Sequence, residues 1–183
     1  VRKQLSDNLV EQIKLINGKK SYGILHNMAR AYTLIGFYFD KAYYAEAEKI
    51  FNDLITNFPY FTALYEDFSK QKIMQEDYRG AIEIFNRGIK ILPPLDHPYL
   101  NDQHRRQVTS VAVKLYESLG QAYFKIKSYD LALAYYEKVL SLDPRRVVLY
   151  KNIADIYYIQ GQLDKAVVWN KRGWMLNPAD YHW

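Results

Sequence analysis

Histidine and cysteine side chains most readily supply metal ligation or proton transfer near neutral pH, and this sequence uses them sparingly. The chain contains no cysteine, which excludes disulfides, zinc–thiolate sites and thiol catalysis. Its four histidines are irregularly spaced: His26, His97, His104 and His182. His97 and His104 are seven residues apart, but prolines separate them and no ordered carboxylate partner is evident. We therefore expect the histidines on the surface, and no metal or cofactor site.

The sequence motifs of common enzyme classes are also absent. There is no G-x-S-x-G nucleophile motif, no glycine-rich phosphate loop and no H-E-x-x-H zinc motif. Adjacent acids such as Glu66-Asp67 are expected on solvated helix surfaces or turns rather than as an acid–base pair. The sequence therefore predicts a protein that is not an enzyme and has no catalytic residues.

The composition is that of an ordinary globular chain, with 183 residues of which 49% are hydrophobic and 25% charged. Its formal net charge of +5 is spread over scattered Lys and Arg residues, with small groups such as Arg105-Arg106 and Arg145-Arg146. Nucleic-acid binders usually gather positive charge on one face, so binding through a basic surface is an unlikely alternative. No apolar run approaches the ~20 residues that span a bilayer.

Several residue classes recur along the chain at the same intervals, which indicates internal repeats. Four prolines are separated by 34, 51 and 34 residues: Pro59, Pro93, Pro144 and Pro178. Four alanines keep these intervals: Ala47, Ala81, Ala132 and Ala166. Two aromatic series follow the first two intervals: Phe51, Phe85 and Tyr136, and Tyr44, Tyr78 and Tyr129. Because 51 exceeds 34 by 17, we predict four 34-residue units with a 17-residue insertion between the second and the third.

Each unit has the hydrophobic pattern of two helices. In the last unit, Tyr150, Ile153, Ala154 and Tyr157 fall at i, i+3, i+4 and i+7, which is one face of a helix. Gly161 ends this helix, and a second apolar pattern follows. A proline after the second pattern cannot continue a helix and ends the unit.

The third unit matches a known family best. It places Tyr116, Leu119, Gly120 and Tyr123 in its first helix, followed by Ala132, Tyr136 and Pro144. This pattern at a 34-residue period resembles the tetratricopeptide repeat. The resemblance covers 136 of the 183 residues, in units 28–61, 62–95, 113–146 and 147–180. It implies an all-α fold, a right-handed superhelical solenoid of antiparallel helix pairs.

The first unit is the weakest match and the two chain ends lie outside the repeats. We expect the first helix of unit 28–61 to start earlier, near Gly23. Residues 1–27 include an amphipathic helix, either a cap or a degenerate repeat, and residues 181–183 stop where a further helix is expected. Val167 and Trp174 are then left partly uncovered, and self-association through terminal helices becomes an option. The start at Val1 also suggests a piece of a longer protein.

The insertion, residues 96–112, divides into a proline loop and an extension of the next helix. Asn101 or Asp102 is the predicted N-cap, and the helix should run over residues 102–126. Near its start lie three basic residues, which form either a secondary contact surface or a solvated helix end: His104, Arg105 and Arg106.

The family resemblance implies a concave groove lined by the first helix of each pair. Eleven groove residues follow: Lys70, Ile73, Met74, Glu117, Gln121, Phe124, Lys125, Lys151, Asp155, Tyr158 and Ile159. Tyr32 and Phe39 would extend this groove into the first unit. Apolar residues at positions that do not pack the repeats indicate a ligand with apolar anchors, unless the N-terminal helix or the insertion fills the groove.

The resemblance therefore implies a non-enzymatic module that binds a peptide or helix of a protein partner. The carboxylate clamp of chaperone-binding relatives is not reproduced, because Lys70, Gln121 and Asp155 stand at one of its positions. One alternative is a domain appended to a larger membrane or envelope protein, such as a surface polysaccharide polymerase or ligase. The compartment, cytoplasmic or extracytoplasmic, is left open.

Overall fold

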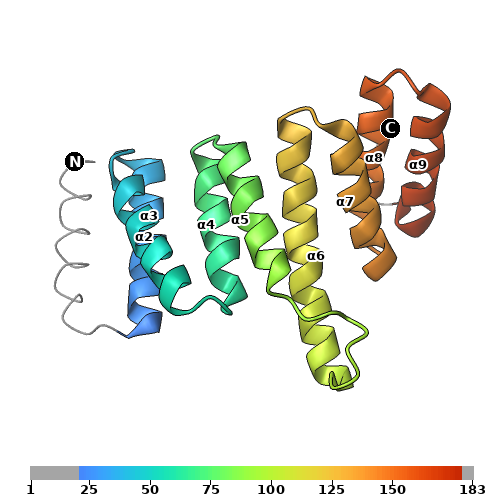
Figure 1. Cartoon of the computed structure of the whole chain (residues 1–183). Coiled ribbons are helices and arrows are strands. Elements are labelled where there is room, and N and C mark those ends of the chain that lie inside the picture. The colour runs from blue at the N-terminus through green and yellow to red at the C-terminus, as the bar shows by residue number, and fades with distance from the viewer. Residues whose placement is uncertain (1–20, 179–183) are drawn as a thin grey trace. The chain divides into compact units, whose positions relative to one another are not determined.

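The computed structural model describes residues 21–178, and all of its regular elements are α-helices (Figure 1). The eight helices within this range are α2 (Tyr22–Tyr38), α3 (Tyr43–Asn57), α4 (Thr62–Met74), α5 (Tyr78–Lys90), α6 (Asp102–Lys125), α7 (Tyr129–Leu142), α8 (Val147–Ile159) and α9 (Leu163–Leu176). They belong to two compact units, residues 1–92 and 93–183, which we call unit 1 and unit 2. These two are larger than, and distinct from, the four 34-residue units of the sequence. The predictions for residues 1–20 and 179–183 lie outside the described residues.

Unit 1 contains two helix pairs, α2 with α3 and α4 with α5, and α3 also packs on α4. Its core is aromatic at the centre, where the rings of Phe51 and Phe68 stack with centroids 5.2 Å apart. Ala47 is also fully buried, and its small side chain lets two helices approach closely. Helix α2 begins at Tyr22, so the predicted early start near Gly23 is confirmed.

Unit 2 repeats this arrangement with α6 against α7 and α8 against α9. Its core consists mainly of buried residues from α7 and α8, including Tyr136, Val139, Leu149 and Ile153, with Val113 from α6. Ala132 is again fully buried, at the same place in its pair as Ala47. These apolar side chains leave water when the helices pair, which is the main favourable term in the folding of such a unit.

The turn between the two helices of a pair also follows the repeat interval. Glu76, Lys127 and Gly161 all have positive φ angles, of 62°, 61° and 74°. A residue in the left-handed backbone conformation reverses the chain between the helices at this point, and glycine adopts that conformation without strain. The intervals between the three residues are 51 and 34, so the backbone geometry has the period of the sequence.

Helix α6 is the longest, at 24 residues, and confirms the predicted extension over the insertion. Asn101 is its N-cap, and its side-chain oxygen accepts a hydrogen bond from the backbone nitrogen of His104 at 2.8 Å. The guanidinium of Arg105 donates to the carbonyl oxygens of Leu95, at 2.9 Å, and Leu100, at 3.2 Å. Arg105 therefore ties the proline loop to the start of α6.

The closest helix contact in unit 2 generates a first prediction. A Cβ atom on Gly120 would lie 2.6 Å from Cε1 of Tyr136, whose ring is buried, so the ring or the helix would have to shift. We expect Gly120→Ala to lower the free energy of unfolding by about 1–3 kcal/mol through overpacking, measured by urea denaturation. Gly23→Ala is the matched control because a Cβ there meets nothing within 4 Å. Equal stability of the two variants would contradict the close seating of Tyr136 on Gly120.

Candidate interaction groove

The predicted groove residues of unit 2 come from α6 and α8, the first helices of its two pairs. Tyr158 and Ile159, at the end of α8, are 69% and 50% exposed, which is high for large apolar side chains. Phe124, near the end of α6, is half-buried and its ring lies 5.8 Å from that of Tyr129. These faces are free because each first helix packs its other faces against the second helices.

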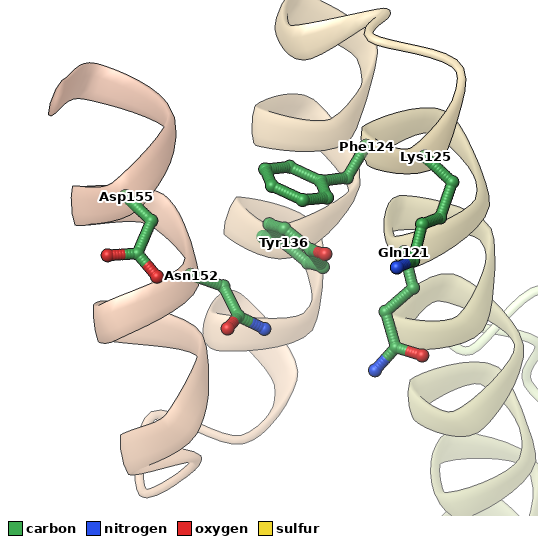
Figure 2. Close-up of a pocket in the computed structure, with 6 residues that line it drawn as sticks. All are labelled: Gln121, Phe124, Lys125, Tyr136, Asn152 and Asp155. Carbon is green, nitrogen blue, oxygen red and sulfur yellow. The ribbon is translucent and has the colours of Figure 1, made fainter. Parts of the chain in front are cut away.

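A hollow of about 260 Å³ lies between α6 and α8. Figure 2 shows the residues that line it: Gln121, Phe124 and Lys125 from α6, Tyr136 from α7, and Asn152 and Asp155 from α8. Gln121, Phe124, Lys125 and Asp155 were predicted as groove residues. Asn152 lies three residues before Asp155 on the same helix face, a spacing that could have revealed it. Tyr136 was assigned to packing alone.

Two other predicted residues of unit 2 have different surroundings. The Glu117 carboxylate accepts from the guanidinium of Arg146 at 3.1 Å, and Arg146 also pairs with Asp143 at 3.2 Å. Glu117 therefore joins α6 to the chain just before α8, in addition to lying near the groove. Lys151 is exposed on α8 and does not line the hollow.

The surroundings of the Tyr136 hydroxyl disfavour its ionised form. Burial, and then the negative charge of Glu117, raise the pKa of this hydroxyl far above its ordinary value. The hydroxyl therefore stays protonated at any physiological pH and is available as a hydrogen-bond donor.

Unit 1 has a smaller hollow of its own, of about 190 Å³. Its lining includes the predicted residues Lys70 and Met74, together with Arg30, Thr33, Leu34, Phe51 and Asp67. Ile73 is half-buried and does not line it. The expectation for Tyr32 is wrong: it is buried, and its ring stacks on Tyr43 at 5.9 Å because it fills the contact between α2 and α3. Phe39, in contrast, is 38% exposed.

A network of charged groups borders the hollow of unit 1. His26 Nε2 lies 2.9 Å from a carboxylate oxygen of Asp67, and Arg30 Nε lies 3.5 Å from the same oxygen. Lys70 binds Glu66 at 2.6 Å and lies 3.9 Å from Asp67. The expectations of a surface histidine and of solvated acids are therefore wrong here, because the packing of α2 against α4 brings His26 and Asp67 together.

The pKa of Asp67 reflects this network. Burial by itself would raise the pKa of the Asp67 carboxyl, but the hydrogen bond from His26 and the charges of Arg30, His26 and Lys70 outweigh burial. The pKa of Asp67 is therefore held below its ordinary value. Lys70, already paired with Glu66, is less available to a ligand than the sequence suggested.

The other predicted contact surfaces are exposed. His104 and Arg106 point to solvent at the start of α6, whereas Arg105 is engaged with the proline loop. Val167 and Trp174 on α9 are 59% and 41% exposed, which confirms that the described residues leave this helix partly uncovered. Self-association through this face stays a prediction.

Two other kinds of site, a metal centre and a membrane-spanning helix, have no candidate among the described residues. Among residues 21–178, no group of three or more His, Asp or Glu side chains is placed to hold a metal ion. None of the helices α2–α9 has the length and apolar character needed to cross a bilayer. The sequence-based expectation of a protein without catalytic residues stays a prediction.

The comparison with protein families now identifies the repeats. The family model for the tetratricopeptide repeat matches residues 113–146, which are also the residues of the third predicted unit. The chain is a tetratricopeptide-repeat protein. The crystal structure of MamA aligns with it at a TM-score of 0.69 and 19% identity, over 98% of this chain and 95% of that one. The predicted fold class, an all-α solenoid of antiparallel helix pairs, is thereby confirmed.

Curated relatives share parts of the repeat array. Protein ycf37 of Guillardia theta is 48% identical over 52 residues, which are 28% of this chain and 29% of that protein. N-alpha-acetyltransferase 16, NatA auxiliary subunit, of Mus musculus is 30% identical over 125 residues, 67% of this chain and 14% of that protein. The chain thus spans less than a third of the length of either relative. Tetratricopeptide repeats are generally scaffolds for protein–protein interaction, and the repeats of this chain support such a role.

The network around Asp67 generates a second prediction. Because the folded-state pKa lies below the unfolded value of about 3.9, the carboxylate stabilises the fold fully above that value, and the contribution disappears as pH falls through the folded pKa. We expect Asp67→Asn to lower the free energy of unfolding at pH 7 by about 1–2 kcal/mol. Urea denaturation should also show a smaller loss of stability than in wild type between about pH 5 and about pH 2.

Asp53→Asn is the control for this experiment because Asp53 is exposed on α3 and its carboxylate forms no ion pair with the described residues. Its acid profile should follow that of wild type. An Asp67→Asn profile parallel to wild type would show that the network does not favour the ionised carboxylate.

Proposed function

We propose that this tetratricopeptide-repeat protein binds an extended or helical segment of a protein partner along α6 and α8 of unit 2. The observation that carries the proposal is the hollow between these helices, which has Phe124 on one wall. Tyr158 and Ile159 are exposed three and four residues after Asp155, which lines the hollow, and this spacing places them on the same face of α8. No packing role within the described residues explains why large apolar side chains stand on this face.

The energetic argument rests on Tyr158 and Ile159. Large apolar side chains of this kind contribute about 1.5–3 kcal/mol each when they are fully transferred out of water. Both stand largely in solvent at present, so a partner that covers them recovers much of this energy. Together with the half-buried Phe124 they form one anchor region, as in other grooves that hold a peptide by apolar side chains.

The charges near this region favour a protein partner over a nucleic acid. Lys125 and Asp155 line the same hollow with opposite signs. A phosphate backbone needs a continuous basic surface, which this hollow does not provide. The relative from Mus musculus is named as an auxiliary subunit, and a subunit role within an assembly is in keeping with the proposal for this chain.

A third prediction tests the groove directly by pull-down from lysate of the source organism. Phe124→Ala combined with Tyr158→Glu removes one apolar wall and places a charge on the other. We expect this variant to bind the partner at least tenfold more weakly than wild type does. A loss of about 1.4 kcal/mol of binding free energy suffices for that change. Tyr158 is exposed but Phe124 is half-buried, so circular dichroism checks that the variant is folded.

The matched control is Tyr60→Glu with Tyr99→Glu, because these tyrosines are 81% and 89% exposed and lie outside both hollows. It carries more new charge than the groove variant but should retain the partner. Equal loss in both variants would assign the effect to charge, and retention by both would remove α6 and α8 as the binding surface.

A fourth prediction separates protein binding from nucleic-acid binding. A contact that neutralises several phosphates loses about 10³–10⁵ in affinity between 50 and 200 mM salt. We expect the affinity for the captured partner to change less than about tenfold over this range, because apolar anchors are not screened by ions. A steep loss, measured by titration at stepped salt concentrations, would favour the basic-surface alternative.

A further inference from the structure

The Tyr136 hydroxyl is a polar group that the protein itself does not use. The side chain of Tyr136 is only 2% exposed, yet its hydroxyl forms no hydrogen bond with any described residue. The hydroxyl is not one of the fully enclosed polar atoms, so its oxygen is open to the hollow and can meet a ligand there. Tyr136 lines the hollow of unit 2, where Figure 2 shows its ring between the side chains from α6 and those from α8.

Packing does not require this hydroxyl. Phe51 and Phe85 stand 85 and 51 residues earlier, at the same place in their helix pairs, and both are fully buried. Phe51 also lines the hollow of unit 1, so the two hollows share a buried ring and differ in its oxygen. A phenyl ring therefore suffices for the fold, and the oxygen of Tyr136 adds only a hydrogen-bonding group to the hollow.

The surroundings of the hydroxyl favour a neutral acceptor. The hydroxyl stays protonated, as shown above, and so it donates. The charged group that acts on it is the Glu117 carboxylate, whose charge is partly offset by Arg146 but still disfavours an anionic acceptor. Lys125 and Asp155 also line the hollow and carry opposite charges, so a charged ligand would be attracted by one and repelled by the other. The remaining common acceptor is an uncharged carbonyl oxygen.

The walls of the hollow match a carboxamide. Gln121 and Asn152 face the hollow from α6 and α8, and their side-chain amides form no hydrogen bond with the described residues. Each amide offers both donors and an acceptor, so each can pair with a second carboxamide. Because Tyr136 is almost covered, its oxygen can be reached by an inserted side chain more readily than by a main chain lying across the rim.

We propose that the hollow of unit 2 receives the carboxamide side chain of an Asn or Gln in the partner segment. Its carbonyl oxygen accepts from the Tyr136 hydroxyl, and its NH₂ group donates to the side-chain oxygen of Gln121 or Asn152. This inference rests on the proposed function, and it adds a specificity element to the apolar anchor region. Tyr136 is thereby a ligand-binding residue as well as a core residue.

The test uses a phage-displayed library of random heptapeptides, selected against the full chain. Three proteins are compared: wild type, Tyr136→Phe, and Tyr135→Phe as the matched control. Tyr135 is the neighbouring residue on α7, but its ring stacks on Tyr123 and does not line the hollow. We expect wild type and Tyr135→Phe to enrich Asn or Gln at one position, and Tyr136→Phe to lose this preference.

A synthetic peptide of the enriched sequence gives the quantitative readout. It should bind Tyr136→Phe about threefold to tenfold more weakly than wild type, as measured by calorimetry, which is the effect of one neutral hydrogen bond. The melting temperature of Tyr136→Phe should equal or exceed that of wild type, because Phe51 and Phe85 fill the same place in other pairs. A lower melting temperature would assign the hydroxyl a structural role and overturn the inference.

The remaining outcomes separate this inference from the proposed function. Enrichment of Asp or Glu, enrichment without any position preference, or an equal Asn or Gln preference in Tyr136→Phe would overturn the carboxamide inference and leave groove binding standing. A failure of wild type to enrich any peptide would overturn both, because the hollow would then not hold a peptide segment at all.

Discussion

Unit 2 depends on one contact, in which a buried aromatic ring of one helix packs against a glycine of the partner helix. A Cβ on Gly120 would come within 2.6 Å of the Tyr136 ring, so the approach of α6 and α7 requires glycine at this point. Unit 1 contains a similar contact, because a Cβ on Gly36 would lie 2.8 Å from the Tyr44 ring. Because interiors are close-packed, such contacts set how near the two helices of a pair can lie.

This packing leaves one face of the first helices of each pair out of contact with the second helices. In unit 2, α6 and α8 present Gln121, Phe124 and Asp155 around one hollow, with Tyr136 behind them (Figure 2). The same ring therefore closes the core on one side and supplies a hydrogen-bond donor on the other. A solenoid of helix pairs can vary the exposed residues without changing its core, which explains how one repeat pattern accommodates different partners.

Electrostatic details were the part of the site that sequence reasoning described least well. The sequence predicts Lys70 and Glu117 as groove residues, and in the structure Lys70 also binds Glu66 and Glu117 also binds Arg146. His26 was expected at the surface, yet it contacts Asp67, which lies 41 residues away. Such pairs depend on rotamers and on the approach of different helices, and neither can be read from periodicity. Tyr32 was misplaced for a related reason, because its side chain turns into the contact with Tyr43.

The sequence by itself determined the class of fold, the two-helix form of each repeat and the long helix that begins within the insertion. These follow from short-range rules, since the 34-residue period, the helix-breaking prolines and the Asn101 cap act within a few turns of chain. Only the tertiary structure decided which polar groups meet and which stay free. The unpaired hydroxyl of Tyr136 is the clearest case, because a ring at that position looks the same in sequence whether its oxygen is satisfied or faces a hollow. The difference is made by α6 and α8, which are brought to either side of it by packing against α7.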